Sequence, residues 1–277
     1  MKIAVLSDPH IGSTNSVFVP NWEKVVSHVN ARDDIDLAVI LGDITLLGSE
    51  QAEDLRFGRN ALNALNKPWL ALPGNHDVGD ISRNSHQPAN ADRLADWEAL
   101  YGPWHWQSDL IPGWRLIGLN SQIIGTGLPE EQLQWETLER ALAMRARLKP
   151  VLLMHMPLFL EDWEEADRPA WALMGDGRNR LRRLIEEHDI RAVVTGHMHR
   201  VVQFDLPQTR FIWCAASSFL TYDKSMPAQP GAALLGLTIL TLDDEEIRAE
   251  FVELEEMMVS RIEDYNGTIY RSPAKDA

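Results

Sequence analysis

The strongest constraint on the fold is a series of short apolar runs, separated by longer helix-like segments, over the first two-thirds of the chain. Each run is nearly continuously apolar, which is typical of strands covered on both faces. The runs are Lys2–Ser7, Leu37–Leu41, Trp69–Leu72, Leu116–Leu119, Val151–Met154 and Ala192–Thr195. Helical patterns lie between them at Asn21–Asn30, Glu50–Asn66, Ala91–Leu100, Glu130–Leu148 and Arg178–His188. This alternation predicts an α/β layered sheet.

The pattern changes after residue 205, where strand-like segments follow one another without a long helix between them. These segments are Arg210–Ala216, Ala232–Leu242 and Ile247–Leu254, and the acidic turn at 243–246 predicts an antiparallel hairpin of the last two. No repeat or linker interrupts the chain, so we expect one domain over residues 1–277. We expect residues 255–277 to form a tail, a lid or an oligomer contact, and the irregular stretches 78–90 and 158–177 to be functional lids or surface decoration.

Composition excludes several classes of protein. The 277 residues include 26 Lys and Arg against 41 Asp and Glu, a formal charge of −15, which argues against binding duplex nucleic acid through a basic face. A single cysteine, Cys214, excludes a disulfide framework. No apolar run approaches the roughly 20 residues needed to cross a bilayer, and the first residues lack the pattern of a signal peptide. We therefore expect a cytoplasmic protein without stable membrane association, with a homo-oligomer left open.

Side chains that bind metals follow almost every strand-like run. They occur in five short motifs: Asp8-Pro9-His10, Gly42-Asp43, Gly74-Asn75-His76-Asp77, His155 and Gly196-His197-Met198-His199. Ligands of open α/β sheets gather beyond the carboxyl ends of the strands, so these residues can converge although they are far apart in the chain. The pairs Asp8/His10 and His197/His199 are two residues apart, which at a strand end lets both members face one pocket.

The residue types indicate which metals such a pocket would take. Asp and His together suit Mn, Fe, Co or Zn rather than Mg or Ca. Seven candidate ligands are too many for one ion and suit two. Glycines directly before ligands, at Gly42, Gly74 and Gly196, indicate close approach of the backbone or unusual dihedral angles. Any one motif occurs by chance in many proteins, but five in this order are specific.

The ordered set D-x-H, G-D, G-N-H-D, H and G-H-x-H resembles the signature of the calcineurin-like metallophosphoesterases over residues 1–200. The resemblance implies a four-layer αββα sandwich with two transition-metal ions, such as Mn²⁺, Fe²⁺/Fe³⁺ or Zn²⁺, at one edge of two mixed sheets. It implies that one metal is held by Asp8, His10, Asp43 and His199. The other would be held by Asp43, Asn75, His155 and His197, with Asp43 bridging.

The resemblance also implies roles for the remaining residues of the third motif. His76 would face the substrate phosphate, and Asp77 would orient His76. A hydroxide bridging the two metals would attack phosphorus in line. The substrate-binding residues would be Asn75, His76 and His199, and His86 is a further candidate because it lies in the loop after this motif.

Within the family, Gly42-Asp43-Ile44-Thr45 and the segment from Leu119 to Gly127 are similar to the class III cyclic nucleotide phosphodiesterase and glycerophosphodiesterase subgroup. Asn120 departs from that pattern, in which Asp is commoner. We expect hydrolysis of phosphodiester bonds in a small phosphate-ester substrate. The alternatives are a phosphomonoesterase or a phospholipase C-type hydrolase on the same centre. A scaffold without metals is disfavoured because every expected ligand position is filled.

Overall fold

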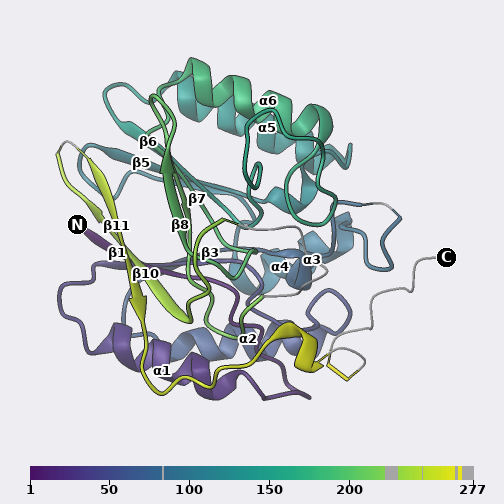
Figure 1. Ribbon diagram of the computed structural model, residues 1–277. Helices are drawn as coiled ribbons and strands as arrows, with labels where there is room; N and C mark the ends of the chain where they lie inside the picture. Colours follow the sequence, from purple (N-terminus) through teal and green to yellow (C-terminus); the bar gives the residue numbers. More distant parts are fainter. Residues whose placement is uncertain (83, 222–229, 245, 266–267, 270–277) are drawn as a thin grey trace.

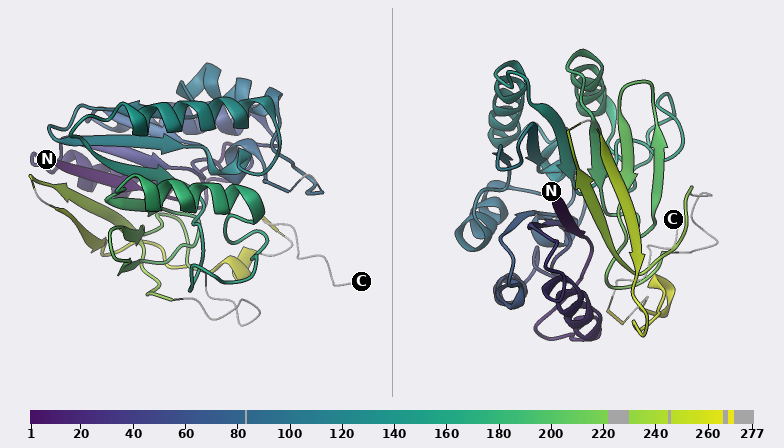
Figure 2. Two further views of the ribbon diagram at one scale, coloured as in Figure 1. Left: turned by 90° about the horizontal axis from the view of Figure 1, so that it is seen from above. Right: turned by 90° about the vertical axis from the view of Figure 1, so that its left-hand side faces the viewer.

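Two β-sheets lie face to face between two layers of helices in the computed structural model (Figures 1 and 2), which describes residues 1–82, 84–221, 230–244, 246–265 and 268–269. One sheet has the strand order β11-β10-β1-β2-β3, and the other has the order β4-β5-β6-β7-β9-β8. In each sheet the central strands run parallel and an edge carries antiparallel partners. This confirms the predicted αββα sandwich of two mixed sheets.

The strands of the first sheet are β1 (Lys2–Leu6), β2 (Leu37–Leu41), β3 (Trp69–Leu72), β10 (Gly236–Leu242) and β11 (Ile247–Glu253). Those of the second are β4 (Trp106–Ser108), β5 (Trp114–Leu119), β6 (Lys149–Met154), β7 (Ala192–Thr195), β8 (Val202–Asp205) and β9 (Arg210–Trp213). The helices are α1 (Val19–Asn30), α2 (Ala52–Ala61), α3 (Asn75–Val78), α4 (Ala91–Tyr101), α5 (Pro129–Ala143) and α6 (Gly175–Glu187). Short 3₁₀ helices occupy Leu62–Ala64, Ser121–Ile123 and Ile262–Tyr265.

The central strands are apolar on both faces because each face packs against a different layer. In β1, Ile3 and Val5 join the core between the two sheets, whereas Ala4 and Leu6 pack toward the helices of the first sheet. Helices α5 and α6 cover the outer face of the second sheet, in the upper part of Figure 1, with a core that includes Trp135. The continuous apolar runs in the sequence therefore arise because these strands are buried on both faces.

Most predicted elements are confirmed, and the differences lie at their ends. The helix predicted to run from Glu130 to Leu148 stops at Ala143, where Met144 leaves helical geometry (φ −98°, ψ 16°), and Ala146 then adopts a left-handed conformation (φ 53°). The helix expected over Glu50–Asn66 covers Ala52–Ala61 and then tightens into a 3₁₀ turn.

In the last third of the chain, the segment predicted from Arg210 to Ala216 is a strand only to Trp213, and the one predicted from Ala232 begins at Gly236. The hairpin of β10 and β11 is confirmed as antiparallel. The short edge strands β4 and β8 were not predicted, because they have too few residues to show a pattern in the sequence.

The C-terminal segment lies partly against the first helix. The side chain of Asn21 in α1 accepts a hydrogen bond from Met258 N (2.7 Å) and donates one to Met258 O (2.9 Å). Of the segment 255–277, residues 266–267 and 270–277 lie outside the described residues, so its role as tail, lid or oligomer contact stays a prediction, as does the single domain. Among the helices that are described, none is long and apolar enough to cross a membrane.

Candidate metal centre

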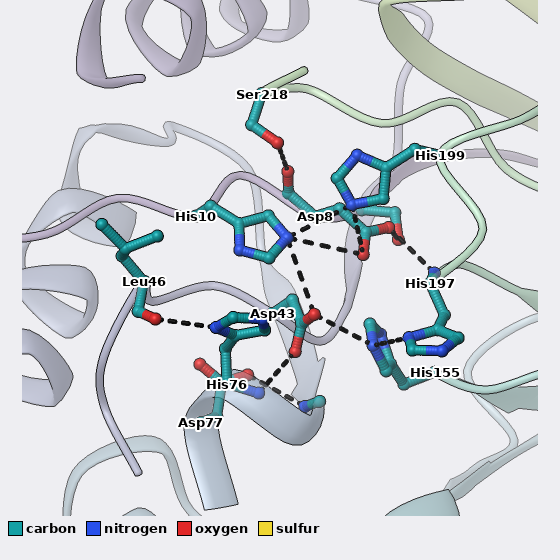
Figure 3. Close-up of polar contacts among 12 residues, drawn as sticks. Asp8, His10, Asp43, Leu46, His76, Asp77, His155, His197, His199 and Ser218 are labelled. Atoms are coloured by element: carbon teal, nitrogen blue, oxygen red, sulfur yellow. Dashed lines mark hydrogen bonds and ion pairs between the residues drawn. The ribbon is translucent and has the colours of Figure 1, made fainter. Parts of the chain in front are cut away.

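The predicted ligands meet at one edge of the sandwich, where parallel strands from both sheets end. Asp8, Asp43 and Asn75 follow β1, β2 and β3 of the first sheet, and His155 and His197 follow β6 and β7 of the second. Figure 3 shows the side chains of Asp8, Asp43, His155 and His197 converging on one region together with those of His10, His76 and His199. Three groups have ligand atoms close enough to share a metal ion: Asp8, His10 and His199; His10, Asp43 and His76; and Asp43, His155 and His197.

The backbone is strained at the ligands themselves. Five of them adopt left-handed conformations: Asp8 (φ 54°), His10 (47°), Asp43 (48°), His197 (67°) and His199 (50°). Residues other than glycine rarely adopt the left-handed region, and such backbone strain concentrates at functional sites. The two-residue spacing therefore does not work through one face of an extended strand, as the sequence analysis assumed. The strands end earlier, at Leu6 and Thr195, and alternate left-handed residues aim the side chains.

The glycines before the ligands allow the loops to touch, as the sequence predicts. A Cβ on Gly74 would lie 2.2 Å from Asp43 Oδ1, and one on Gly196 would lie 1.9 Å from Ser7 Oγ. Gly42 combines a φ of 86° with a position where a Cβ would be 2.8 Å from His155 Nδ1. Larger residues at these positions would push the ligands apart.

Each of the two aspartates is anchored through one oxygen and presents the other to imidazole rings. Asp8 Oδ2 accepts hydrogen bonds from Ser7 Oγ and from the main-chain N of His197 (3.0 Å), while Oδ1 lies 3.4 Å from His199 Nε2. Asp43 Oδ1 accepts from the main-chain N of His76 (2.8 Å). Asp43 Oδ2 lies 3.6 Å from His10 Nε2 and 3.3 Å from His155 Nε2. Asp43 is therefore shared by two of the groups.

Main-chain carbonyls determine which ring nitrogens face the centre. Nδ1 of His155 lies 2.7 Å from Leu41 O, Nδ1 of His199 lies 2.7 Å from Phe219 O, and Nε2 of His197 lies 2.8 Å from Ala170 O. A carbonyl oxygen only accepts, so each of these nitrogens carries the proton, and the other nitrogen of a neutral ring presents a lone pair. Sequence reasoning missed these carbonyls, because a main-chain oxygen leaves no mark on residue identity.

Two buried oxygens at the centre have no hydrogen-bond partner among the described residues. They are Asp8 Oδ1 and Asn75 Oδ1, from the first and third motifs. An unpaired buried acceptor is costly unless something positive binds it. Together with the inward lone pairs of the imidazoles, these oxygens form a donor set that fits transition-metal cations. The residues present therefore fit the two metal ions that the sequence implies.

The electrostatics of the cluster show the same demand for positive charge. Burial would raise the pKa of Asp8 and of Asp43, but His199 and His155 respectively outweigh it and hold both pKa values below normal. Burial would lower the pKa of His155, yet Asp43 raises it to about 9. The pKa of His197 falls to about 4 through burial and the charge of His155. The carboxylates thus favour positive charge on the His155 ring, while the His197 ring is kept neutral.

His76 and Asp77 lie at the start of α3, and their side chains have different hydrogen-bond partners. Nδ1 of His76 lies 2.8 Å from the carbonyl oxygen of Leu46. The Asp77 carboxylate instead accepts from the main-chain N of Thr45 (2.9 Å) and of Gly74 (2.9 Å) and from Thr45 Oγ1 (2.7 Å). The expectation that Asp77 orients His76 is therefore wrong. Asp77 joins the loops after β2 and β3, and a peptide carbonyl orients His76.

Two other expectations concern residues at the margin of the centre. His86 is outside the three groups, and its ring lies 3.6 Å from Glu50, so its contact with substrate stays a prediction. Asn120 is fully buried, and its Oδ1 accepts from Gln122 N (2.9 Å) while its Nδ2 has no hydrogen-bond partner among the described residues. Asn120 thus lies outside the three groups, and the candidate ligand set is complete without it.

Comparisons with known proteins agree with this geometry. The family model of calcineurin-like phosphoesterases matches residues 1–201. A probable cyclic nucleotide phosphodiesterase of Synechococcus is 26% identical over 228 residues, which cover 81% of each chain. The human serine/threonine-protein phosphatase CPPED1 is 24% identical over 228 residues, 78% of this chain and 65% of the human protein. The structure of a purple acid phosphatase from yellow lupin superposes with a TM-score of 0.67 at 14% identity, covering 98% of this chain and 55% of the lupin chain.

Proposed function

Because this chain belongs to the calcineurin-like phosphoesterase family, we propose that it is a metal-dependent phosphodiesterase for small molecules, of the cyclic nucleotide or glycerophosphodiester type. The observation that carries the proposal is the position of Asp43, whose Oδ2 lies 3.6 Å from His10 and 3.3 Å from His155. A carboxylate shared in this way supports two neighbouring cations. The similarity to a probable cyclic nucleotide phosphodiesterase over most of both chains favours a diester as substrate.

We assign Asp8, His10, Asp43 and His199 to one metal and Asp43, Asn75, His155 and His197 to the other, with Mn²⁺, Fe²⁺/Fe³⁺ or Zn²⁺ as the ions. Bound there, such cations supply Lewis-acid stabilisation of a phosphoryl group and lower the pKa of water. The chain itself supplies the geometry: carbonyls at Leu41, Phe219 and Ala170 fix three of the rings.

His76 is the candidate proton donor of the proposed reaction. Its Nδ1 is occupied by the carbonyl of Leu46, so only Nε2 can exchange a proton with a substrate. Its main-chain N donates to Asp43 Oδ1 (2.8 Å), which ties its position to the residue shared by the two metals. A positioned imidazole of this kind contributes typically about 10²–10⁴-fold to a rate.

A phosphomonoesterase is the second candidate, because the human relative is named as a protein phosphatase. The two are separated by comparing bis(p-nitrophenyl) phosphate with p-nitrophenyl phosphate on protein loaded with Mn²⁺. We expect kcat/KM for the diester to exceed that for the monoester by at least about tenfold, or ~1.4 kcal/mol of transition-state stabilisation. A preference for the monoester would overturn the proposal.

Two variants keep this comparison interpretable. His197→Ala removes a proposed ligand and should abolish turnover of both esters, whereas His188→Ala, at the end of α6 and outside the three groups, should retain it. A panel of 3′,5′-cAMP, 2′,3′-cAMP and glycerophosphocholine, run on the same samples with metal analysis, then ranks the candidate substrates.

A further inference from the structure

One peptide unit lies between His76 and a buried carboxylate that the function above does not use. The carbonyl of Leu46 accepts from His76 Nδ1 at 2.8 Å, as Figure 3 shows. The N–H of Leu47, on the same peptide bond, donates to Asp54 Oδ2 at 3.0 Å. Asp54 in α2 and His76 in α3 therefore bind opposite ends of a single peptide group.

Asp54 is completely buried, and both of its oxygens are in use. While Oδ2 accepts from Leu47, Oδ1 accepts from the main-chain N of Ser13 (2.8 Å) and from Ser13 Oγ (2.7 Å). Ser13 belongs to the loop after β1, which carries Asp8 and His10, and Leu47 to the loop after β2, which carries Asp43. A single carboxylate thus links two ligand-bearing loops, which main-chain hydrogen bonds such as His10 N to Asp43 O (2.9 Å) also join.

The planarity of the peptide bond links the two hydrogen bonds. In a trans peptide the C=O and the N–H point in opposite directions, so the group cannot rotate without breaking both contacts. A hydrogen bond to a carboxylate is stronger than one between neutral groups, and it polarises the carbonyl at the other end of the peptide. Asp54 therefore fixes the direction of the Leu46 carbonyl and strengthens its hydrogen bond with the His76 ring.

We propose that Asp54 is a positioning residue for His76 and acts through the Leu46–Leu47 peptide group. The inference rests on the proposed function, in which His76 protonates the leaving group. As the oxygen of the attacking water forms a bond to phosphorus, the bond from phosphorus to the leaving oxygen breaks. Its electron pair stays with the leaving oxygen, which takes the proton from Nε2 of the imidazolium. The ring is left as the neutral tautomer with its proton on Nδ1, which is the form that the Leu46 carbonyl stabilises. Solvent takes the proton of the attacking water and returns a proton to Nε2 of the ring.

A double-mutant cycle tests this coupling on a diester with a poor leaving group, which depends most on protonation. Asp54→Asn keeps the shape of the side chain but puts an amide N–H opposite Leu47 N or Ser13. We expect kcat to fall roughly 10-fold to 100-fold with KM little changed, and to fall less than about twofold in a His76→Ala background. Equal losses in both backgrounds would overturn the inference.

The matched control is Glu53→Gln, one residue away in the first turn of the same helix. Glu53 is exposed, and its carboxylate lies 3.7 Å from Arg56, so this variant should match the parent protein in kcat and KM. A loss with Glu53→Gln equal to that with Asp54→Asn would show that removing charge from α2 explains the effect, and would overturn the inference.

A spectroscopic measurement keeps the test valid if Asp54→Asn does not fold or if no ester is turned over. In zinc-loaded protein with ¹⁵N-labelled histidine, the His76 ring, assigned by its loss in His76→Ala, should hold its proton on Nδ1 with a downfield shift. Asp54→Asn should weaken that shift. A wild-type ring with its proton on Nε2 would overturn the inference, and the absence of any esterase activity alongside the expected spectrum would overturn only the proposed function.

Discussion

Nδ1 of His197 lies 3.1 Å from Nε2 of His155, and in the neutral rings both nitrogens present lone pairs. The other nitrogen of each ring donates to a carbonyl, Ala170 for His197 and Leu41 for His155. Two lone pairs at this distance repel, and only positive charge between or on the rings relieves the repulsion. The carboxylate of Asp43 raises the pKa of His155 to about 9, so this ring draws positive charge, and a metal cation would satisfy both rings at once.

The shared position of Asp43 predicts how metal content divides between variants. Asp43→Ala removes the carboxylate that lies beside both His10 and His155, so it should empty both metal positions. His197→Ala should empty one. The number of metal ions per chain is measured after loading with Mn²⁺ and dialysis. It should fall from about two to near zero in Asp43→Ala and to about one in His197→Ala. Equal losses in the two variants would contradict the shared role of Asp43.

Asn75→Ala tests the unpaired amide oxygen of the third motif. Asn75 Oδ1 is buried and has no hydrogen-bond partner within the described part of the chain. Its removal should therefore change the stability of the fold little, but it removes a proposed ligand from one metal position. We expect metal content to fall by about one ion per chain and kcat by about 100-fold or more. Asn63→Ala, at an exposed asparagine that contacts Arg59, is the control. Unchanged metal content and activity in Asn75→Ala would remove this residue from the ligand set.

Gly196→Ala tests the close approach of two loops. A Cβ there would lie 1.9 Å from Ser7 Oγ and 2.8 Å from Asp8 Oδ2, so it should displace Asp8 and release metal. In Gly113→Ala the new Cβ meets open space, but φ is 81°, so we expect about 1–2 kcal/mol of backbone strain and full metal content. Thermal unfolding of both variants measures the effect of backbone strain on stability, and metal analysis measures whether Asp8 has been displaced. Normal metal binding by Gly196→Ala would show that the loops can move apart freely.

Cys214 should be inert in the folded protein. It is buried at the end of β9, and burial raises the pKa of its thiol to about 12. At pH 8 only about one thiol in ten thousand would be ionised, and the thiolate is the reactive form. Labelling with a thiol reagent should therefore be absent in native protein and reach one thiol per chain in denaturant. Rapid native labelling would show that this strand opens.

The strands and the candidate ligands could be predicted from the sequence for physical reasons. Strands such as β1 and β2, buried on both faces, require unbroken apolar runs, and parallel strands present their carboxyl ends at a common edge. Metal chemistry restricts the residue types that can follow. The C-terminal end of α5 and the start of β10 were harder to predict, because they depend on unusual dihedral angles at Met144 and Gly236.

The sequence by itself determined which side chains could bind metal and that they would gather at one edge, because burial and ligand chemistry both restrict residue identity. Only the tertiary structure decided how they are held. The left-handed residues that aim the ligands, the carbonyls that select ring nitrogens and the peptide group between His76 and Asp54 depend on main-chain direction. Every residue carries the same carbonyl and N–H, so no pattern of side chains reveals which of them will face an imidazole ring.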